Sequence, residues 1–420
     1  MKRSISLRPL LSKRVLHEQS RTEAFVREHF GEGINRVAVD LTLTDNPSVH
    51  QRAALIALLE LCLRMDPVVR EVRLHIPSEE TEVEESIAEI ALRFPLEQLK
   101  SSSDDRQTIG VGVGRTIGTY VDASDWRIGF SETTVPMSTA TGPASVFAAL
   151  EAAKYIFLRA VEAQPTWPIG RVFDLVSWNW SQSPRTYRVA PPSSLPPIAL
   201  VGCGGVAAGY LWFLRSLHLQ GELVLVDDDR IVWHNMNRLF FATVNDANLE
   251  RRKVCSAAEY MRGWKVEALE KRAEHERAID ALERTRRAGG LIASAVGEPE
   301  TRKFLARRGF EYFYDAATNS MGSAQVLALR PGISSCAECH LRVRPIARPE
   351  GCGAIITRKF AGVVPHLAAY AGALMALEQL RPLLVSAPAL SGANTQSVLR
   401  SIEPQGREST LPCSDCPFLR

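Results

Sequence analysis

The chain has 420 residues, of which 45% are hydrophobic and 23% are charged, and its formal net charge is +3. This length predicts two domains, and so small a charge gives no ground for a nucleic-acid or membrane partner. The apolar runs are too short or too interrupted to span a membrane, and the start MKRSISLR does not resemble a secretion signal, so we expect a cytoplasmic protein.

The first half of the chain has the pattern of an α/β unit. Residues 36–43 and 72–76 predict buried strands, and residues 49–64 between them predict a helix, which implies parallel strand pairing. A second helix, rich in alanine, is expected over residues 142–157. Residues 181–197 are rich in proline and serine, which disfavour helix and central strand, so we predict a linker between domains there.

After this linker, strands and helices alternate as in a doubly wound sheet. A short strand at 197–201 precedes the glycine-rich turn GCGG, and a helix follows at 206–217. Further strands are expected at 222–227, 266–269 and 291–295, and further helices at 250–261, 275–287 and 299–307. A helix rich in small residues at 364–380 resembles the one at 142–157, which indicates two related halves.

The glycine turn predicts a phosphate-binding loop. Gly202, Gly204 and Gly205 lie between a strand and a helix, where backbone N–H groups can hold a phosphate. Oxidoreductases that use NAD or FAD have similar turns, so the turn alone leaves them open. Asp227 ends the next strand, where a carboxylate that binds a ribose is expected, and Asp229 extends an acidic turn.

Two basic residues after this turn favour adenylation over hydride transfer. Arg238 follows Asn235 in the sequence NMNR, and Lys253 lies near the start of the next predicted helix. A guanidinium and an ammonium directed at the loop would stabilise the charge that grows on an α-phosphate under acyl attack. Hydride transfer has no such requirement.

Two CxxC pairs in the last quarter of the chain predict a metal site. The four thiols belong to Cys336, Cys339, Cys413 and Cys416. Four thiolates suit tetrahedral structural zinc, and disulfides are rare in the cytoplasm. A site with four cysteines has no open position, so its expected role is to hold the C-terminal tail.

Together these motifs resemble the ubiquitin-activating (ThiF-like) adenylyltransferase superfamily, which includes the bacterial sulfur-carrier adenylyltransferases of thiamine and molybdopterin synthesis. The resemblance covers about Ile198 to Cys416 and the first half only faintly. It implies a Rossmann-like active adenylation domain with a zinc site over 198–420. A degenerate, inactive adenylation-like α/β domain over 1–180 and the linker 181–197 would precede it. The implied cofactors are ATP, Mg²⁺ and Zn²⁺.

The resemblance also implies roles for single residues. Asp227 and Asp229 would hold the ATP ribose and assist the metal. Arg238 and Lys253 would contact the phosphates, and Asn235 would help to shape the pocket.

The chain departs from the superfamily pattern at two positions. Ala207 occupies the sixth position of the glycine loop, a change that only tightens helix packing. Gly297 stands where the superfamily has an aspartate that contacts Mg²⁺. The next residue, Glu298, is the candidate replacement, because a carboxylate oxygen is a usable ligand for this ion.

Cys352 is the expected nucleophile. In superfamily members that form a thioester, the cysteine lies between the first CxxC pair and the small-residue helix, and Cys352 lies there between two glycines. Arg348 and Arg358 could favour its thiolate. The three remaining cysteines are expected to have no catalytic role: Cys62, Cys203 and Cys255.

The leading hypothesis is an ATP-dependent activating enzyme for a ubiquitin-like protein. It would adenylate the C-terminus of the modifier, form a thioester on Cys352 and pass the acyl group to a conjugating enzyme. An inactive first half would make the chain a fused pseudo-dimer, although a homodimer is also open. Arg14 or Arg21 would then reach the ATP from that half.

This architecture most resembles the activating enzymes of bacterial ubiquitin-like conjugation operons, some of which are implicated in antiphage defence. Two alternatives stay open. One is a sulfur-carrier or peptide adenylyltransferase without a conjugating partner. The other is a non-catalytic scaffold with a dead nucleotide site, which Gly297 motivates.

Overall fold

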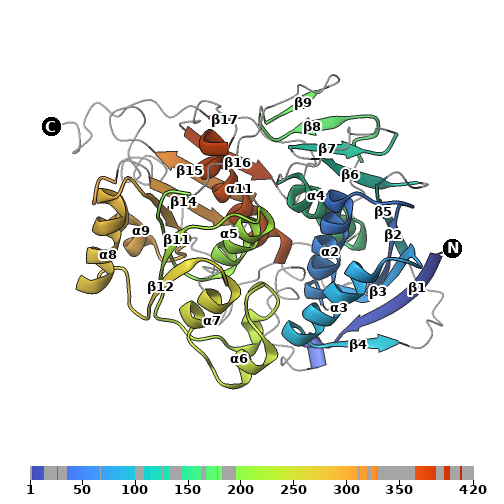
Figure 1. Ribbon diagram of the computed structural model, residues 1–420, viewed down its shortest axis with the longest axis horizontal. Coiled ribbons are helices and arrows are strands. Elements are labelled where there is room, and N and C mark those ends of the chain that lie inside the picture. The colour runs from blue at the N-terminus through green and yellow to red at the C-terminus, as the bar shows by residue number, and fades with distance from the viewer. Residues whose placement is uncertain are drawn as a thin grey trace.

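The computed structural model shows an α/β protein built on two mixed sheets (Figure 1). The structure describes residues 2–13, 26, 36–66, 68–99, 108–114, 116, 118–124, 126–132, 143–161, 167–176, 178–181, 195–310, 313–318, 323–329, 365–384, 392–397 and 407–408. Among the described helices, none is long and apolar enough to cross a membrane.

The described residues of the first half form a nine-stranded sheet. Its strands, in spatial order, are β4 (Leu96–Leu99), β1 (Lys2–Pro9), β3 (Val69–Pro77), β2 (Val37–Leu43), β5 (Thr108–Val113), β6 (Tyr120–Ser124), β7 (Arg127–Phe130), β8 (Val172–Asp174) and β9 (Asn179–Ser181). Its helices are η1 (Leu11–Lys13), α2 (Val49–Arg64), α3 (Thr81–Arg93) and α4 (Ala144–Ala160). β2 pairs in parallel with β3, which confirms the predicted βαβ unit.

The described residues of the second half form an eight-stranded sheet. Its strands, in spatial order, are β12 (Lys265–Leu269), β11 (Glu222–Val226), β10 (Ile198–Val201), β13 (Leu291–Ser294), β14 (Phe313–Thr318), β15 (Ser323–Leu329), β16 (Gly392–Ser397) and β17 (Arg407–Glu408). Its helices are α5 (Gly205–Ser216), η3 (Trp233–Asn235), α6 (Val244–Asn248), α7 (Lys253–Tyr260), α8 (Glu276–Arg287), α9 (Pro299–Ala306) and α11 (Pro365–Leu384).

From β12 to β14 the strands of this second sheet are all parallel. Counted by their order in the chain, they lie as 3-2-1-4-5, which is the Rossmann arrangement. This confirms the doubly wound pattern expected from the alternating strands and helices. β15, β16 and β17 continue the sheet as antiparallel strands.

The central strand β10 is buried on both faces, as its uninterrupted apolar sequence predicts. Ile198 and Leu200 pack into a core shared with α5 and α11, whereas Ala199 and Val201 pack into a second core with α8 and α9. Successive side chains of a strand point to opposite faces, so helices cover both sides of the sheet.

The two sheets repeat one another. In the first half the parallel strands β3, β2, β5 and β6 are followed by the antiparallel β7, β8 and β9. In the second half β11, β10, β13 and β14 are followed in the same way by β15, β16 and β17. α2 follows β2 as α5 follows β10, and α4 precedes β8 as α11 precedes β16. This order agrees with two related halves.

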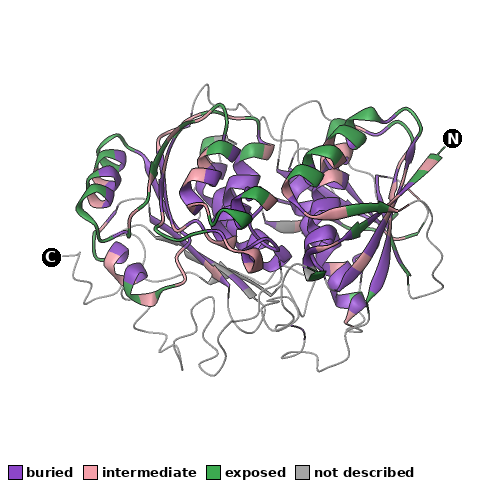
Figure 2. Ribbon diagram, turned by 90° about the horizontal axis from the view of Figure 1, so that it is seen from below, coloured by how far each residue is buried: buried purple, intermediate pink, exposed green. Residues whose placement is uncertain are grey.

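Helices α2 and α4 of the first half and α5 and α11 of the second lie between the two sheets (Figure 1). They share one continuous core, and Figure 2 shows buried residues concentrated where the helices face one another and the sheets. A Cβ added to Gly372 would lie 1.9 Å from the Val206 carbonyl oxygen, so the α5 and α11 backbones touch. Across the halves, the Tyr370 hydroxyl donates to Glu151 Oε1 at 2.9 Å.

Candidate functional site

The glycine loop turns the chain from β10 into α5. Gly202 has a φ of +85°, and an added Cβ would lie 2.9 Å from the Ala295 carbonyl oxygen, so this position requires glycine. Gly204 is different, because its backbone is extended and an added Cβ would meet nothing within 4 Å. Gly204 is also the N-cap of α5, and a glycine has no side chain with which to cap this helix end. The first-turn N–H groups are therefore available to a ligand.

Asp227 ties the acidic turn to the glycine loop. Its Oδ2 accepts the Cys203 N–H at 2.5 Å, and its Oδ1 accepts the Asp229 N–H at 2.7 Å. Burial raises the pKa of Asp227 above its usual value, and Lys253 and the two N–H groups only partly offset this. Each carboxylate oxygen keeps a second lone pair, so Asp227 can shape the loop and still accept a ligand hydroxyl.

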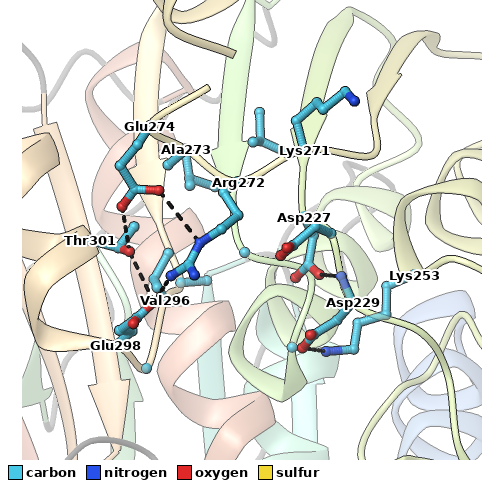
Figure 3. Close-up of a pocket in the computed structure, with 17 residues that line it drawn as sticks. Asp227, Asp229, Lys253, Lys271, Arg272, Ala273, Glu274, Val296, Glu298 and Thr301 are labelled. Carbon is cyan, nitrogen blue, oxygen red and sulfur yellow. Dashed lines mark hydrogen bonds and ion pairs between the residues drawn. The ribbon is translucent and has the colours of Figure 1, made fainter. Parts of the chain in front are cut away.

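Lys253 begins α7 and pairs with the acidic turn. Its Nζ lies 2.5 Å from Asp229 Oδ2, and its side chain is only 10% exposed (Figure 3). Oxygen atoms of Asp227, Asp228 and Asp229 lie within 4.8 Å of one another. Three clustered carboxylates suit a hard cation such as Mg²⁺, so the residues present fit this ion.

The opposite wall of the pocket carries an ion-pair network. Arg272 Nη2 lies 2.6 Å from Glu298 Oε2, and Arg272 Nε lies 3.8 Å from Glu274 (Figure 3). The Thr301 hydroxyl donates to Glu274 at 2.7 Å. Glu298 thus lies beside Gly297 on the pocket wall, as expected, but its carboxylate is engaged by Arg272 and is not part of the carboxylate cluster.

Together these walls line a pocket of about 440 Å³ at the carboxyl ends of β10, β11 and β13. This is where the order of the parallel strands reverses, the usual ligand position in open α/β sheets. The structure brings together six of the predicted residues here: Gly202, Gly204, Asp227, Asp229, Lys253 and Glu298. Three further lining residues had no sequence motif: Lys271, Arg272 and Glu274. The sequence feature that could have identified them is their position just after β12, at the carboxyl end of a parallel strand.

Arg238 and Asn235 are not among the residues that line this pocket, and Arg238 lies against the first turn of α5. An added Cβ on Gly205 would lie 2.9 Å from Arg238 Cδ, so the arginine stem covers the first turn of the helix. Its Nη1 donates to the His234 carbonyl at 2.9 Å and to Asn237 Oδ1 at 3.1 Å. Asn235 is buried, and its Oδ1 accepts the Val232 N–H at 3.1 Å. Asn235 therefore shapes the turn that carries Arg238.

The cysteines divide into described and undescribed sets. The expected zinc ligands and the expected nucleophile lie outside the described residues: Cys336, Cys339, Cys413, Cys416 and Cys352. Arg14 and Arg21 also lie outside them.

The three described cysteines are poor nucleophiles. Burial raises the pKa of the Cys62, Cys203 and Cys255 thiols, and Cys255 also donates to Glu270 at 3.3 Å. All three therefore stay protonated near neutral pH.

Curated relatives resemble part of this chain. Ubiquitin-like modifier-activating enzyme 5 of Drosophila melanogaster and that of Drosophila simulans are each 27% identical to it over 161 residues. The matched region is 34% of this chain and 38% of those enzymes, so the chain spans well under half of their length.

Solved structures of MccB from E. coli show a looser likeness. The complex with ATP is 15% identical, with a TM-score of 0.40 over 53% of this chain and 66% of that one. The complex with MccA-N7isoASN is 16% identical, with a TM-score of 0.41 over the same shares.

The model of the ThiF family matches residues 196–415. This region is just over half of the 420 residues and contains the glycine loop, the acidic turn, Arg238 and Lys253. The chain belongs to the ThiF family.

Proposed function

We propose that this chain binds ATP and adenylates the C-terminal carboxylate of a ubiquitin-like protein. The observation that carries this proposal is the pocket at the switch of the β10–β13 sheet. There an uncapped helix N-terminus, an ammonium and a cluster of carboxylates face the same space. The ubiquitin-like substrate is supported by the name of the Drosophila relatives, which activate such a modifier.

The residues of the pocket, together with Arg238, would divide the work of adenylation. The N–H groups of α5 and its dipole would hold the phosphates, and Lys253 and Arg238 would add positive charge at the α-phosphate. Asp229 keeps Lys253 in place through the 2.5 Å ion pair. Mg²⁺ bound to the carboxylates of 227–229 would neutralise phosphate charge. The modifier carboxylate then attacks the α-phosphate, and pyrophosphate leaves.

We also propose that the first half is an inactive counterpart of the second. In place of the glycine loop, residues 44–48 (TDNPS) lead from β2 into α2. Ser48 and Gln51 form a capping box there, so side chains occupy the N–H groups that a phosphate would need. Gln51 Nε2 donates to Asp122 at 2.8 Å, which fixes this arrangement in the interior. The chain would thus be a fused pseudo-dimer.

ATP–pyrophosphate exchange that depends on the modifier tests the adenylation step. Asp229→Ala and Arg238→Ala should each abolish it, since one orients Lys253 and the other supplies charge. Asp280→Ala, an exposed acid on α8 outside the pocket, is the matched control and should exchange at the wild-type rate. Exchange at the wild-type rate in Asp229→Ala or in Arg238→Ala would refute this placement of the site.

The thioester and transfer to a conjugating enzyme are the finer part of the proposal. The three described cysteines are at least partly buried and have raised thiol pKa values, and we assign four of the other five to zinc, so Cys352 is the favoured nucleophile. Enzyme, ATP and modifier should give an adduct on a non-reducing gel that a reductant removes and Cys352→Ala lacks. Cys352→Ala should keep pyrophosphate exchange, because adenylation precedes thiol attack. No cysteine-dependent adduct would mean that the enzyme stops at the adenylate, as a sulfur-carrier or peptide adenylyltransferase does.

Structural zinc is proposed on the two CxxC pairs. Metal analysis should find one zinc per chain in the wild type and none after the double change Cys413→Ser/Cys416→Ser. Zinc binding at such sites contributes folding energy, so this change should destabilise the C-terminal tail. It should not abolish ATP binding directly. Zinc retained in the double variant would show that Cys413 and Cys416 are not zinc ligands.

A non-catalytic scaffold remains the second candidate, and one observation favours it. On the β13 side of the pocket, Gly297 offers no side-chain ligand and Glu298 is paired with Arg272. A scaffold would bind ATP without modifier-dependent exchange.

A further inference from the structure

We propose that Arg64, the last residue of α2 in the first half, is a positioning residue for Arg238 in the second half. It would do so by holding the backbone of residues 236–241, which we call the arginine segment. The half that we propose to be inactive would thereby set the geometry of the half that we propose to bind ATP. This inference rests on the proposed function, in which Arg238 contacts the ATP phosphates.

The contacts of Arg64 bracket Arg238. The Arg64 side chain is fully buried, and its Nη1 donates to the Met236 carbonyl at 2.5 Å and to the Leu239 carbonyl at 3.3 Å. One acceptor precedes Arg238 in the chain and the other follows it. A planar guanidinium can direct several N–H groups at fixed angles, so it holds the turn in one place.

A buried guanidinium needs a counter-charge, and Glu60 supplies it. Arg64 Nη2 donates to Glu60 Oε1 at 2.8 Å, one helical turn earlier on α2. Arg93 of α3 lies 3.8 Å from Glu60 Oε2, and its Nη1 donates to the Phe240 carbonyl at 3.4 Å. Three backbone carbonyls of the arginine segment, those of Met236, Leu239 and Phe240, therefore accept hydrogen bonds from two arginines of the first half.

Aromatic rings extend the same contact to the phosphate-binding helix. The Arg64 guanidinium lies 4.8 Å from the Phe240 ring centroid and 5.2 Å from that of Phe94. Phe240 in turn stacks on Trp212 of α5, with the ring centroids 5.0 Å apart and the planes at 8°. The arginine segment is thus clamped between the first half and α5, the helix whose first turn the Arg238 stem covers.

The consequence concerns geometry at the phosphates. Arg238 donates to His234 and Asn237, which belong to the same stretch of chain. Arg64 fixes that stretch against the body of the protein. A misplacement of about 1 Å in a group that stabilises the transition state can lower a rate by about 100-fold. Loss of the Arg64 fork should therefore lower kcat more than it raises KM for ATP.

Two variants and a matched control test this role. Arg64→Lys keeps the positive charge but loses the planar guanidinium with its several N–H donors. Arg64→Met keeps only the approximate length of the side chain. Arg381→Met is the control, because Arg381 is equally buried between the halves and donates to the Val176 carbonyl at 2.7 Å, away from the arginine segment. Hydrogen exchange of the 236–241 amides and modifier-dependent pyrophosphate exchange are measured for each.

Both Arg64 variants should raise amide exchange in the arginine segment about tenfold and lower kcat about tenfold or more. Arg381→Met should lose stability without either effect. Arg64→Lys combined with Arg238→Lys, which keeps a positive charge and residual exchange, should be no slower than Arg238→Lys alone, because the first residue acts through the second.

Three results would overturn the inference: unchanged amide exchange in both Arg64 variants, an equal loss of kcat in Arg381→Met, or additive losses in the double variant. If the wild-type chain shows no pyrophosphate exchange, the proposed function fails. The amide exchange of the arginine segment then still decides whether Arg64 holds it.

Discussion

A pair of alanine substitutions in the glycine loop separates the needs of the fold from the needs of a ligand. Gly202 has a left-handed backbone and an occupied Cβ position, whereas Gly204 has an extended backbone and an open one. Gly202→Ala should therefore damage the protein itself. Gly204→Ala should place a methyl group only in the space that we assign to a phosphate.

The expected magnitudes follow from these geometries. At Gly202, a left-handed alanine costs roughly 1–2 kcal/mol, and the Ala295 carbonyl must also move, so the loss should exceed this value. At Gly204, alanine lowers the conformational entropy of the unfolded chain, which stabilises the fold by roughly 0.4–1 kcal/mol. Alanine is also a poorer N-cap than glycine, which destabilises the fold. These two effects nearly cancel, so the free energy of unfolding should change by less than about 0.5 kcal/mol.

Urea unfolding and ATP calorimetry on both variants measure the two effects. Gly204→Ala should unfold like the wild type and bind ATP at least about tenfold more weakly, a loss of about 1.4 kcal/mol in binding free energy. Gly202→Ala should lose both stability and binding. Wild-type ATP affinity in Gly204→Ala would refute the claim that phosphate approaches this backbone.

Three further predictions address the core, a buried base and the pocket wall. Gly372→Ala should destabilise the chain by roughly 2 kcal/mol or more in urea unfolding, since the new methyl meets a backbone carbonyl of α5, whereas Gly110→Ala, with open space around it, should not. Burial, and then Lys154, lower the pKa of His366 from 6.5 to about 3, so the fold disfavours its protonation. The free energy of unfolding should then fall between pH 6.5 and pH 3, by up to about 1.4 kcal/mol per unit, and His366→Gln should flatten this slope; an unchanged slope would contradict the assignment. Glu298→Ala should strengthen ATP binding in calorimetry about threefold, because Arg272 loses the nearer of its two carboxylate partners and the phosphates meet one carboxylate fewer; loss of Mg²⁺-dependent binding would instead make Glu298 a metal ligand.

Much of the fold followed from local patterns. The helix over 49–64 begins and ends at the predicted residues, because Ser48 caps its start and the apolar spacing runs to its end. The alternating strands and helices after residue 197 gave the parallel sheet, since crossover connections leave few other arrangements. The loop glycines, Asp227, Asp229 and Lys253 meet for the same reason, as each follows or faces the carboxyl end of a neighbouring strand.

The remaining features depend on contacts distant in the sequence. Arg272 and Glu274 look like surface charges in a polar loop, and only the sheet order brings them opposite Glu298. Asn235 accepts the N–H of Val232, three residues earlier, and so shapes the turn that carries Arg238. Arg64 ends a helix, where a basic residue ordinarily faces solvent, but its Met236 acceptor is 172 residues away. No local pattern could predict that contact.

The most direct test of the central claim is a mass spectrum of the modifier. The chain is incubated with ATP, Mg²⁺ and a small ubiquitin-like protein that ends in an exposed glycine. We predict a gain of one AMP at the modifier C-terminus, with release of pyrophosphate, and no gain with Lys253→Ala. An unmodified C-terminus in the presence of bound, intact ATP would contradict adenylation and leave the chain a nucleotide-binding scaffold.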